Sequence, residues 1–435
     1  MTQRALADWL SYLEQLHPSA IDMGLQRVQQ VATQLGLSRP APLVITVTGT
    51  NGKGSTCAFL ESLLLAQGLK VAVYSSPHLL HYNERVRIAG VDATDVELCA
   101  AFAEVERARA QISLTYFEMG TLAAFWLFER TALDAVILEV GLGGRLDAVN
   151  LIDADLALIT SIGLDHADWL GDTRESVAFE KAGILRAGRP ALCGDLDPPL
   201  PLLERVAELD CPLFVRGRDY VLTVDDQAWH WRGLNARGEV LQLDALPLLD
   251  LPLENAALAL QAYALLDLPW QPARLAAALA ATRVVGRLDR RQLHWQGKSL
   301  TLLLDVGHNP HAAEYLAQLL ASRPVPGKRL AVFGLLADKD LSGVLNALRD
   351  EVQDWAVATL PCERSRPAAE IKAALLNLGA QVEAYADVAA ALQTQCTQAT
   401  AEDEILVFGS FYCVAQALEW LACSAAQEVG NGFAR

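Results

Sequence analysis

Residues 44–55, VITVTGTNGKGS, are the segment whose residue types and spacing most clearly indicate a binding or catalytic role. A β-branched apolar run stops at Gly49, and an apolar-periodic segment, 56–69, follows the glycines and predicts a helix. A strand, a glycine turn and a helix aim free backbone N–H groups and the positive end of the helix dipole at one point, which suits a phosphate chain. Lys53 would supply positive charge to the outer phosphates. We therefore predict a phosphate-binding loop.

The loop differs from the common spelling G-x-x-x-x-G-K-[ST], because Gly54 stands where a hydroxyl would bind magnesium. Other side chains must then supply the metal ligands. Ser76, Glu139 and His166 each lie at or just after the end of a predicted strand, and with phosphate oxygens and water they would complete a hard-cation site. Ser76 and His166 also have plainer readings, as a turn serine before proline and as a loop histidine with local hydrogen bonds. Glu139 is harder to explain in this way, because burying an unpaired carboxylate on a strand is costly.

The elements that must position these groups alternate along the chain. Near-continuous apolar runs at 70–74, 134–140 and 155–162 predict buried strands, and 96–109 and 117–130 predict helices. This alternation indicates a doubly wound, mostly parallel sheet, in which ligands bind beyond the carboxyl ends of the strands. We therefore expect the side chains of Lys53, Ser76, Glu139 and His166 to converge on one crevice. Before the first strand, residues 1–37 predict two short helices, with Asp22 as the N-cap of the second.

A second domain is expected after residue 283. Residues 198–251 are proline-rich and then hairpin-like, and helices are predicted at 254–266 and 272–282. The charged segment 284–300 reads as a strand-like linker, after which strands at 300–305, 328–333, 354–359 and 404–408 alternate with helices. We expect an α/β protein with domains 1–283 and 284–435. The second is a smaller, Rossmann-like domain without a glycine-rich phosphate fingerprint, closing over the first.

The composition and net charge of the chain argue against several classes of function. The chain has 435 residues and a formal net charge of −17, which argues against a nucleic-acid partner. Its eight cysteines are dispersed without a C-x-x-C pair, as in reduced cytosolic proteins. The N-terminus lacks a signal-peptide core, and no apolar run is long enough to cross a membrane. We predict a cytoplasmic protein with no membrane partner.

Ten motifs stand in the same order as in one known family. The motifs are TGTNGKGS (48–55), SSPHL (75–79), NERVRI (83–88), EVGLGGRLDAVN (139–150), SIGLDHADWLGDT (161–173), EKAGI (180–184), LENAALAL (253–260), GRLD (286–289), DVGHNP (305–310) and FGSFY (408–412). On these motifs the sequence resembles the Mur ligase superfamily, most closely its folate branch, the bifunctional dihydrofolate synthases/folylpolyglutamate synthases. The sequence departs from the family pattern in two places. VVGRLD (284–289) lacks the proline that many relatives have before the glycine of this motif, and LPLENAALAL (251–260) lacks a His-Gln pair that precedes the asparagine in some folylpolyglutamate synthases.

The resemblance implies an ATP-dependent ligase that adds L-glutamate to dihydropteroate and to reduced folates through an acyl phosphate. It also implies one or two Mg²⁺ ions, a carbamate on Lys181, and a monomer. The implied ATP-binding residues are Thr50, Asn51, Gly52, Lys53, Asn255, Arg287 and Asp305, and the implied metal ligands are Ser76, Glu139, His166 and Lys181. The implied pterin contacts are Asp22, Met23, Gly24, Thr115, Tyr116, Phe117, Glu118, Leu146, Asp147 and Ala148. Lys53, His166, Lys181, Asp305 and His308 are the catalytic candidates.

Several of these residues have ordinary alternatives. Without the resemblance, Lys181 reads as a surface ammonium on a helix, and Thr115 with Phe117 reads as a helix start with a core aromatic. His308 reads as a turn histidine with local hydrogen bonds.

Other functions stay open at this point. They are a monofunctional folylpolyglutamate synthase, a peptidoglycan-type amino-acid ligase, and a P-loop switch or regulatory ATPase. Glutamate-dependent ADP release would separate the ligases from the switch.

Overall fold

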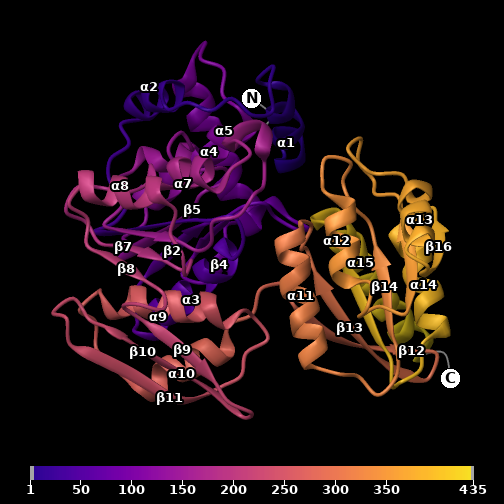
Figure 1. Cartoon of the computed structure of the whole chain (residues 1–435). Coiled ribbons are helices and arrows are strands. Elements are labelled where there is room, and N and C mark those ends of the chain that lie inside the picture. Colours follow the sequence, from indigo (N-terminus) through magenta and orange to yellow (C-terminus); the bar gives the residue numbers. More distant parts are fainter. Residues whose placement is uncertain (1–3, 433–435) are drawn as a thin grey trace. The chain divides into compact units, whose positions relative to one another are not determined.

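The computed structural model describes residues 4–432, with side chains through residue 424. The chain forms two compact units, Met1–Arg283 and Val284–Arg435. Both are α/β units, as predicted (Figure 1). No helix within the described part of the chain is both long and apolar enough to span a bilayer. All eight cysteines are free thiols.

The first unit is built on a mostly parallel sheet. Within the described residues eight strands follow the order β4-β3-β2-β5-β1-β6-β7-β8, and only β3 and β4 run antiparallel to their neighbours. β1 lies between β5 and β6 and is buried on both faces, which explains its continuous apolar run. The strands are β1 Leu43–Thr48, β2 Val71–Tyr74, β3 Val86–Ile88, β4 Val91–Asp92, β5 Ala135–Glu139, β6 Leu156–Ile159, β7 Ala191–Cys193 and β8 Leu213–Val215.

Helices cover both faces of this sheet (Figure 1). α3 and α9 lie below it in that view, and α2, α4, α5, α7 and α8 lie above it. The helices are α1 Leu6–Gln15, α2 Gln26–Leu35, α3 Lys53–Ala66, α4 Asp95–Arg109, α5 Tyr116–Glu129, α6 Ala167–Leu170, α7 Arg174–Ala182, α8 Leu200–Glu208, α9 Leu253–Ala264 and α10 Pro272–Ala281, with 3₁₀ turns η1 Tyr82–Arg85 and η2 Ala148–Leu151. The predicted doubly wound arrangement is confirmed.

The predicted hairpin region is a small antiparallel sheet, β11-β10-β9, formed by Val221–Val224, Ala228–Leu234 and Val240–Pro247. Trp229 and Trp231, two residues apart on β10, are both fully buried. The indole nitrogen of Trp231 donates to the carbonyl of Ala257 at 3.1 Å, which fastens this sheet to α9. α9 in turn packs on α3, so the small sheet supports the helix that follows the phosphate loop.

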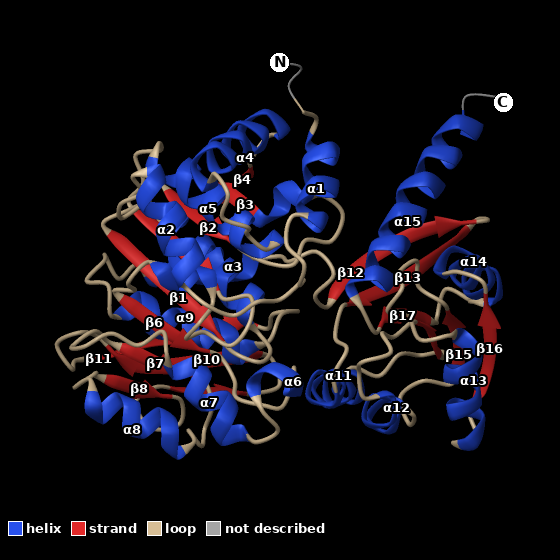
Figure 2. Cartoon of the chain, turned by 90° about the horizontal axis from the view of Figure 1, so that it is seen from above, coloured by secondary structure: helices blue, strands red, loops and turns tan. Residues whose placement is uncertain are grey.

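The described part of the second unit contains one mixed sheet in the order β12-β13-β17-β14-β15-β16, in which only β12 is antiparallel to its neighbour. Figure 2 shows α11, α12 and α13 on one side of it and α14 and α15 on the other. The strands are β12 Asp289–Trp295, β13 Lys298–Asp305, β14 Arg329–Phe333, β15 Asp354–Ala358, β16 Gln381–Tyr385 and β17 Glu404–Phe408. The helices are α11 Pro310–Ser322, α12 Leu341–Leu348, α13 Ala368–Asn377, α14 Val388–Gln398 and α15 Phe411–Gly432.

One local prediction was wrong and another was right only in part. Asp22 does not cap α2, because that helix starts later, its N-cap is Leu25, and no side chain caps it. The segment predicted as a strand-like linker does contain a strand, β12, but this strand belongs to the sheet: it pairs along its whole length with β13 and makes an edge. Charged residues suit such an edge strand, because one of its sides stays open to water.

Candidate active site

The glycine-rich loop joins β1 to α3, as predicted. α3 begins at Lys53, and the ammonium of Lys53 donates to the carbonyls of Gly49 (2.9 Å) and Thr50 (3.2 Å). The hydroxyl of Thr50 donates to the Gly163 carbonyl at 2.8 Å and accepts from the Gly163 amide at 2.9 Å. These contacts fix the loop against the segment after β6. The N-terminus of α3 thus stands beside a positively charged side chain, as phosphate binding requires.

Asn255, at the start of α9, lies directly beside this loop. Its amide Nδ2 donates to the hydroxyl of Ser55 at 2.8 Å. Gly52 has φ +85°, and a Cβ placed there would lie 2.6 Å from Oδ1 of Asn255. Glycine is required at position 52 for two reasons, its left-handed backbone and the close approach of this amide. The structure therefore brings together two predicted nucleotide contacts about two hundred residues apart in sequence.

Two of the four predicted metal ligands, Ser76 and Glu139, meet at the ends of β2 and β5. The backbone amide of Ser76 donates to Oε2 of Glu139 at 3.2 Å. A Cβ at Gly54 would lie 3.7 Å from the same carboxylate, so the loop also passes close to Glu139. His166 lines a pocket together with Ser76. Among the described residues, no three His, Cys, Asp or Glu side chains by themselves form a metal cluster.

Lys181 is buried, with 2% of its surface exposed, so the plain reading as a surface ammonium was wrong. It lies on the last turn of α7, which packs inward here, a fact that the short segment could not reveal. Burial lowers the pKa of Lys181 well below its usual range, and the positive charge of Lys53 lowers it further, while Asp165 acts in the opposite direction. Burial therefore shifts this amine toward its neutral form.

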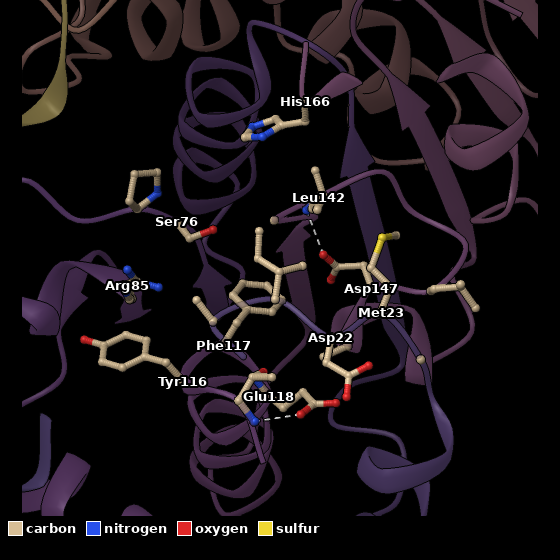
Figure 3. Close-up of a pocket in the computed structure, with 18 residues that line it drawn as sticks. Asp22, Met23, Ser76, Arg85, Tyr116, Phe117, Glu118, Leu142, Asp147 and His166 are labelled. Atoms are coloured by element: carbon tan, nitrogen blue, oxygen red, sulfur yellow. Dashed lines mark hydrogen bonds between the residues drawn. The ribbon is translucent and has the colours of Figure 1, made fainter. Parts of the chain in front are cut away.

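A pocket of about 310 Å³ opens beside these groups (Figure 3). Its lining contains every residue that the resemblance assigned to the pterin: Asp22, Met23, Gly24, Thr115, Tyr116, Phe117, Glu118, Leu146, Asp147 and Ala148. Ser76 and His166 belong to the same lining. Segments from α5, η2 and the loop before α2 thus meet at the carboxyl edge of the sheet, where the strand order places a ligand.

Three carboxylates face this pocket, Asp22, Glu118 and Asp147, and each is bound by donors of the protein. Arg27 pairs with Asp22 at 2.7 Å and with Glu118 at 3.0 Å. The second oxygen of Glu118 accepts from the Thr115 amide at 2.8 Å, so the residue also completes the capping box of α5. Burial raises the pKa of Asp147 to about 6, against the opposing effect of backbone amides that donate to it.

Arg85 also lines the pocket, although the sequence analysis did not single it out. Its Nε donates to Nδ1 of His78 at 2.8 Å, and burial together with this guanidinium lowers the pKa of His78 to about 4. The carboxylate of Glu84 accepts from three successive backbone amides, those of Leu79 (2.7 Å), Leu80 (2.8 Å) and His81 (2.7 Å). Arg85 could be seen in the sequence as part of the NERVRI motif, but its orientation toward the pocket depends on how this loop folds.

In the second unit, the predicted residues gather at the end of β13. The carboxylate of Asp305 accepts from the amides of Leu288 (2.9 Å) and Gly307 (2.7 Å), and burial raises its pKa. The guanidinium of Arg287 lies 5.0 Å from the ring centroid of Phe411, and the ring of His308 lies 6.4 Å from the same aromatic. Nδ1 of His308 is 3.0 Å from the carbonyl of Val306. The local hydrogen bond considered for His308 is therefore present.

Comparison with known proteins gives consistent results for both units. Residues 47–191 match the Mur ligase middle domain, and residues 286–411 match the Mur ligase glutamate ligase domain. A dihydrofolate synthase/folylpolyglutamate synthase of Escherichia coli K12 is 46% identical over 414 residues, covering 95% of each chain. One from Haemophilus influenzae is 44% identical over 426 residues, covering 94% of this chain and 96% of the relative.

Solved structures agree over the same span. Escherichia coli FolC in complex with DHPP and ADP superposes with a TM-score of 0.90 at 46% identity, covering 97% of this chain and 98% of the other. A bifunctional folylpolyglutamate synthase/dihydrofolate synthase with Mn, AMPPNP and L-glutamate bound gives 0.88 at 45% identity, covering 96% and 98%. The chain therefore belongs to the Mur ligase family, within its dihydrofolate synthase/folylpolyglutamate synthase branch.

Proposed function

We propose that this protein joins L-glutamate to dihydropteroate and to reduced folates, at the expense of ATP. The main observation behind the proposal is the composition of the pocket. All ten expected pterin contacts line it, together with Ser76 and His166. An acid acceptor seated there would lie close to Glu139 and to the phosphate loop that approaches it. The bound ligands of the relatives, DHPP, ADP, AMPPNP and L-glutamate, are consistent with these substrates.

The chemistry requires activation of a carboxylate, since its oxygen is a poor leaving group. Transfer of the γ-phosphoryl group of ATP to the acceptor gives an acyl phosphate, which the amino group of glutamate attacks with release of phosphate. Phosphoryl transfer depends mainly on positioning and charge neutralisation. In this chain the amides at the start of α3 and the ammonium of Lys53 would hold the phosphates. Lys53 must exchange its contacts with the loop carbonyls for phosphate oxygens.

The residues around Glu139 suit a divalent cation. A single buried carboxylate, a nearby serine and a histidine are too few to enclose an ion, but they fit a cation that keeps phosphate and water oxygens. Ser76, Glu139 and His166 would hold it, and a relative contains Mn in the presence of a nucleotide. One or two Mg²⁺ ions would neutralise charge on the phosphates during transfer.

Lys181 would complete this site as a carbamate. Its amine is buried, and the charge of Lys53 disfavours an ammonium there. Reaction of the neutral amine with CO₂ forms an N–C bond and releases a proton, leaving an anion with two oxygens. Such a group matches the preference of Mg²⁺ for oxygen ligands. Asp165, which the sequence analysis did not consider, acts on Lys181 electrostatically and on His166 by accepting its backbone amide at 2.9 Å.

Residues of the second unit are proposed to act on the nucleotide and on the incoming amine. Arg287 and Asp305 would contact ATP, and His308 would assist the amine. Their clustering at the end of β13 supports a common task. Closure of a ligase over its acyl phosphate would also exclude water, which otherwise hydrolyses that intermediate.

The test is ADP release by the purified protein with dihydropteroate, a reduced folate or a muramyl acceptor, each with and without L-glutamate. We expect glutamate-dependent release with the first two acceptors only. Release with the reduced folate alone would favour a monofunctional folylpolyglutamate synthase, release with the muramyl acceptor a peptidoglycan-type ligase, and release without either co-substrate a switch ATPase.

Lys53→Ala tests the assignment of the phosphate-binding loop, and Lys70→Ala is its control. We expect Lys53→Ala to abolish turnover, while Lys70→Ala, which removes an exposed lysine just before β2, keeps wild-type activity. Substantial activity in Lys53→Ala would contradict the phosphate-loop assignment.

A further inference from the structure

The charges in the pocket lining are unevenly distributed. Among the lining residues that the structure describes, Arg85 is the only arginine or lysine, whereas Asp22, Glu118 and Asp147 are all acidic. In Figure 3 Arg85 lies with Ser76 and Tyr116 on one side of Phe117, and Asp22 and Asp147 lie on the other. The pocket therefore has an acidic end and a cationic end.

The acidic end suits the pterin. Its carboxylates can accept hydrogen bonds from the amino and ring N–H groups of such a heterocycle, and protein donors already hold each one in place. Arg27 bridges Asp22 and Glu118, and Asp147 accepts from the amides of Leu142 (2.9 Å) and Val149 (3.0 Å). The opposite end of the acceptor, which carries its carboxylates, would then point toward Ser76 and Arg85.

Arg85 is positioned to bind an anion in the pocket. Only 9% of the residue is exposed, and its guanidinium packs 5.3 Å from the ring centroid of Tyr82 and 5.4 Å from that of Tyr116. Its Nε donates to His78, but among the side chains that the structure describes (residues 4–424) neither Nη atom donates a hydrogen bond and no carboxylate forms an ion pair with it. A guanidinium that is nine-tenths buried without an anion is costly, so the pocket must supply one when the site is filled.

The two proposed acceptors differ in the number of their carboxylates. Dihydropteroate has one, and that group becomes the new amide. A folate that already carries glutamate has two at its terminal residue, of which one reacts and one does not. The reacting carboxylate must reach the phosphate and cation end, where Lys53 and the metal provide positive charge. The remaining carboxylate needs a second cation, and Arg85 is the one available in the lining.

We propose that Arg85 binds the non-reacting carboxylate of the glutamate already present on a folate acceptor, and so permits chain extension in the pocket that also takes dihydropteroate. The inference rests on the proposed function and names the residue that separates its two reactions. His78 is a positioning residue. By accepting from Nε, it orients the guanidinium so that both Nη atoms are left for the carboxylate.

The test compares kcat/KM for a reduced folate with kcat/KM for dihydropteroate in the full-length protein. For Arg85→Met we expect the folate-to-dihydropteroate ratio to fall about 10- to 100-fold, since a hydrogen-bonded charge pair contributes about 1.5–3 kcal/mol. The loss should appear mainly in KM for the folate. Arg85→Lys, which keeps the charge but not the fork, should give an intermediate ratio.

Arg130→Met is the matched control, because Arg130 also stacks on an aromatic ring, that of Trp126 at 3.8 Å, but does not line the pocket. We expect its ratio to equal that of the wild type. His78→Leu should lower the ratio in the same direction as Arg85→Met, and His78→Asn, which keeps an acceptor, should restore it. A direct binding measurement supports the kinetics: Arg85→Met should weaken binding of pteroylglutamate relative to pteroate.

Each other result would overturn the proposal. An equal loss with both acceptors would mean that Arg85 holds the reacting carboxylate or supports the fold, and an unchanged ratio would mean that it holds no substrate carboxylate. Loss of both activities in all the Arg85 variants would likewise assign it a structural role. Failure of the proposed function looks different, because the wild-type protein itself would then not use these acceptors.

Discussion

Substitution of Gly52 by alanine should reveal how tightly the phosphate loop is fitted to α9. The backbone of Gly52 is left-handed, with φ +85°, and its missing Cβ would lie 2.6 Å from Oδ1 and 2.8 Å from Nδ2 of Asn255. The Asn255 side chain is itself held by the hydroxyl of Ser55. Alanine at position 52 therefore introduces a backbone cost and a steric cost, and the two can be separated.

The backbone cost is about 1–2 kcal/mol for a non-glycine residue in the left-handed region, and it does not depend on Asn255. The steric cost arises only if Asn255 is present. To make room, the amide must leave Ser55, losing about 0.5–1.5 kcal/mol, and adopt a strained rotamer at about 0.5–1.5 kcal/mol. We therefore expect a coupling of roughly 1–3 kcal/mol between positions 52 and 255.

A double-mutant cycle with Gly52→Ala, Asn255→Ala and the double variant measures this coupling from thermal unfolding midpoints. Gly52→Ala should lower the midpoint by less in the Asn255→Ala background, with about 2 °C for each kcal/mol in a unit as large as Met1–Arg283. Calorimetric ADP affinity should follow the same pattern, because the displaced amide is a proposed nucleotide contact. Additive effects within about 0.5 kcal/mol would refute the close approach and the reasoning built on it.

Three further predictions concern charged groups. Between about pH 4 and pH 6 the native state holds a proton on Asp147 that the unfolded chain has lost, so stability should fall by roughly 3 kcal/mol as pH rises through this window. Unfolding midpoints of Asp147→Asn should lack this part of the pH dependence, and parallel curves for the two proteins would contradict it. Lys181→Ala should release almost no ADP until short carboxylic acids are added, and full activity without them would end the carbamate proposal. Asp305→Ala should raise KM for ATP with little change in unfolding of the first unit, and unchanged ATP kinetics would remove Asp305 from the nucleotide site.

The strand ends were the most predictable part of the site. The apolar runs predicted at 134–140 and 155–162 are β5 and β6, and the polar groups that follow such runs face the same edge of the sheet. Parallel pairing fixes this result, because all carboxyl ends then point the same way. The contact between Ser76 and Glu139 agrees with that rule, because β2 and β5 are parallel neighbours.

Side-chain direction and burial were less predictable. Lys181 looks like a surface lysine in its local sequence, and it is buried only because α7 packs against the rest of the unit. Asp22 has the residue type of an N-cap, but the helix begins later, so the carboxylate pairs with Arg27 and faces the pocket. Arg85 depends on contacts to His78 and Tyr82 in its own loop and to Tyr116 at the start of α5. Such long-range packing leaves no periodic signal.

The carboxylate of Glu84, which gathers the amides of Leu79, Leu80 and His81, has a thermodynamic consequence. Ordering a loop costs roughly 1–2 kcal/mol of backbone entropy for each residue that becomes fixed. Here folding orders the segment between Ser76 and Arg85 before any substrate arrives, so association need not supply that entropy. A residue without a substrate contact can in this way set the affinity for the acceptor, and Glu84→Gln should make binding more dependent on temperature through a larger unfavourable entropy.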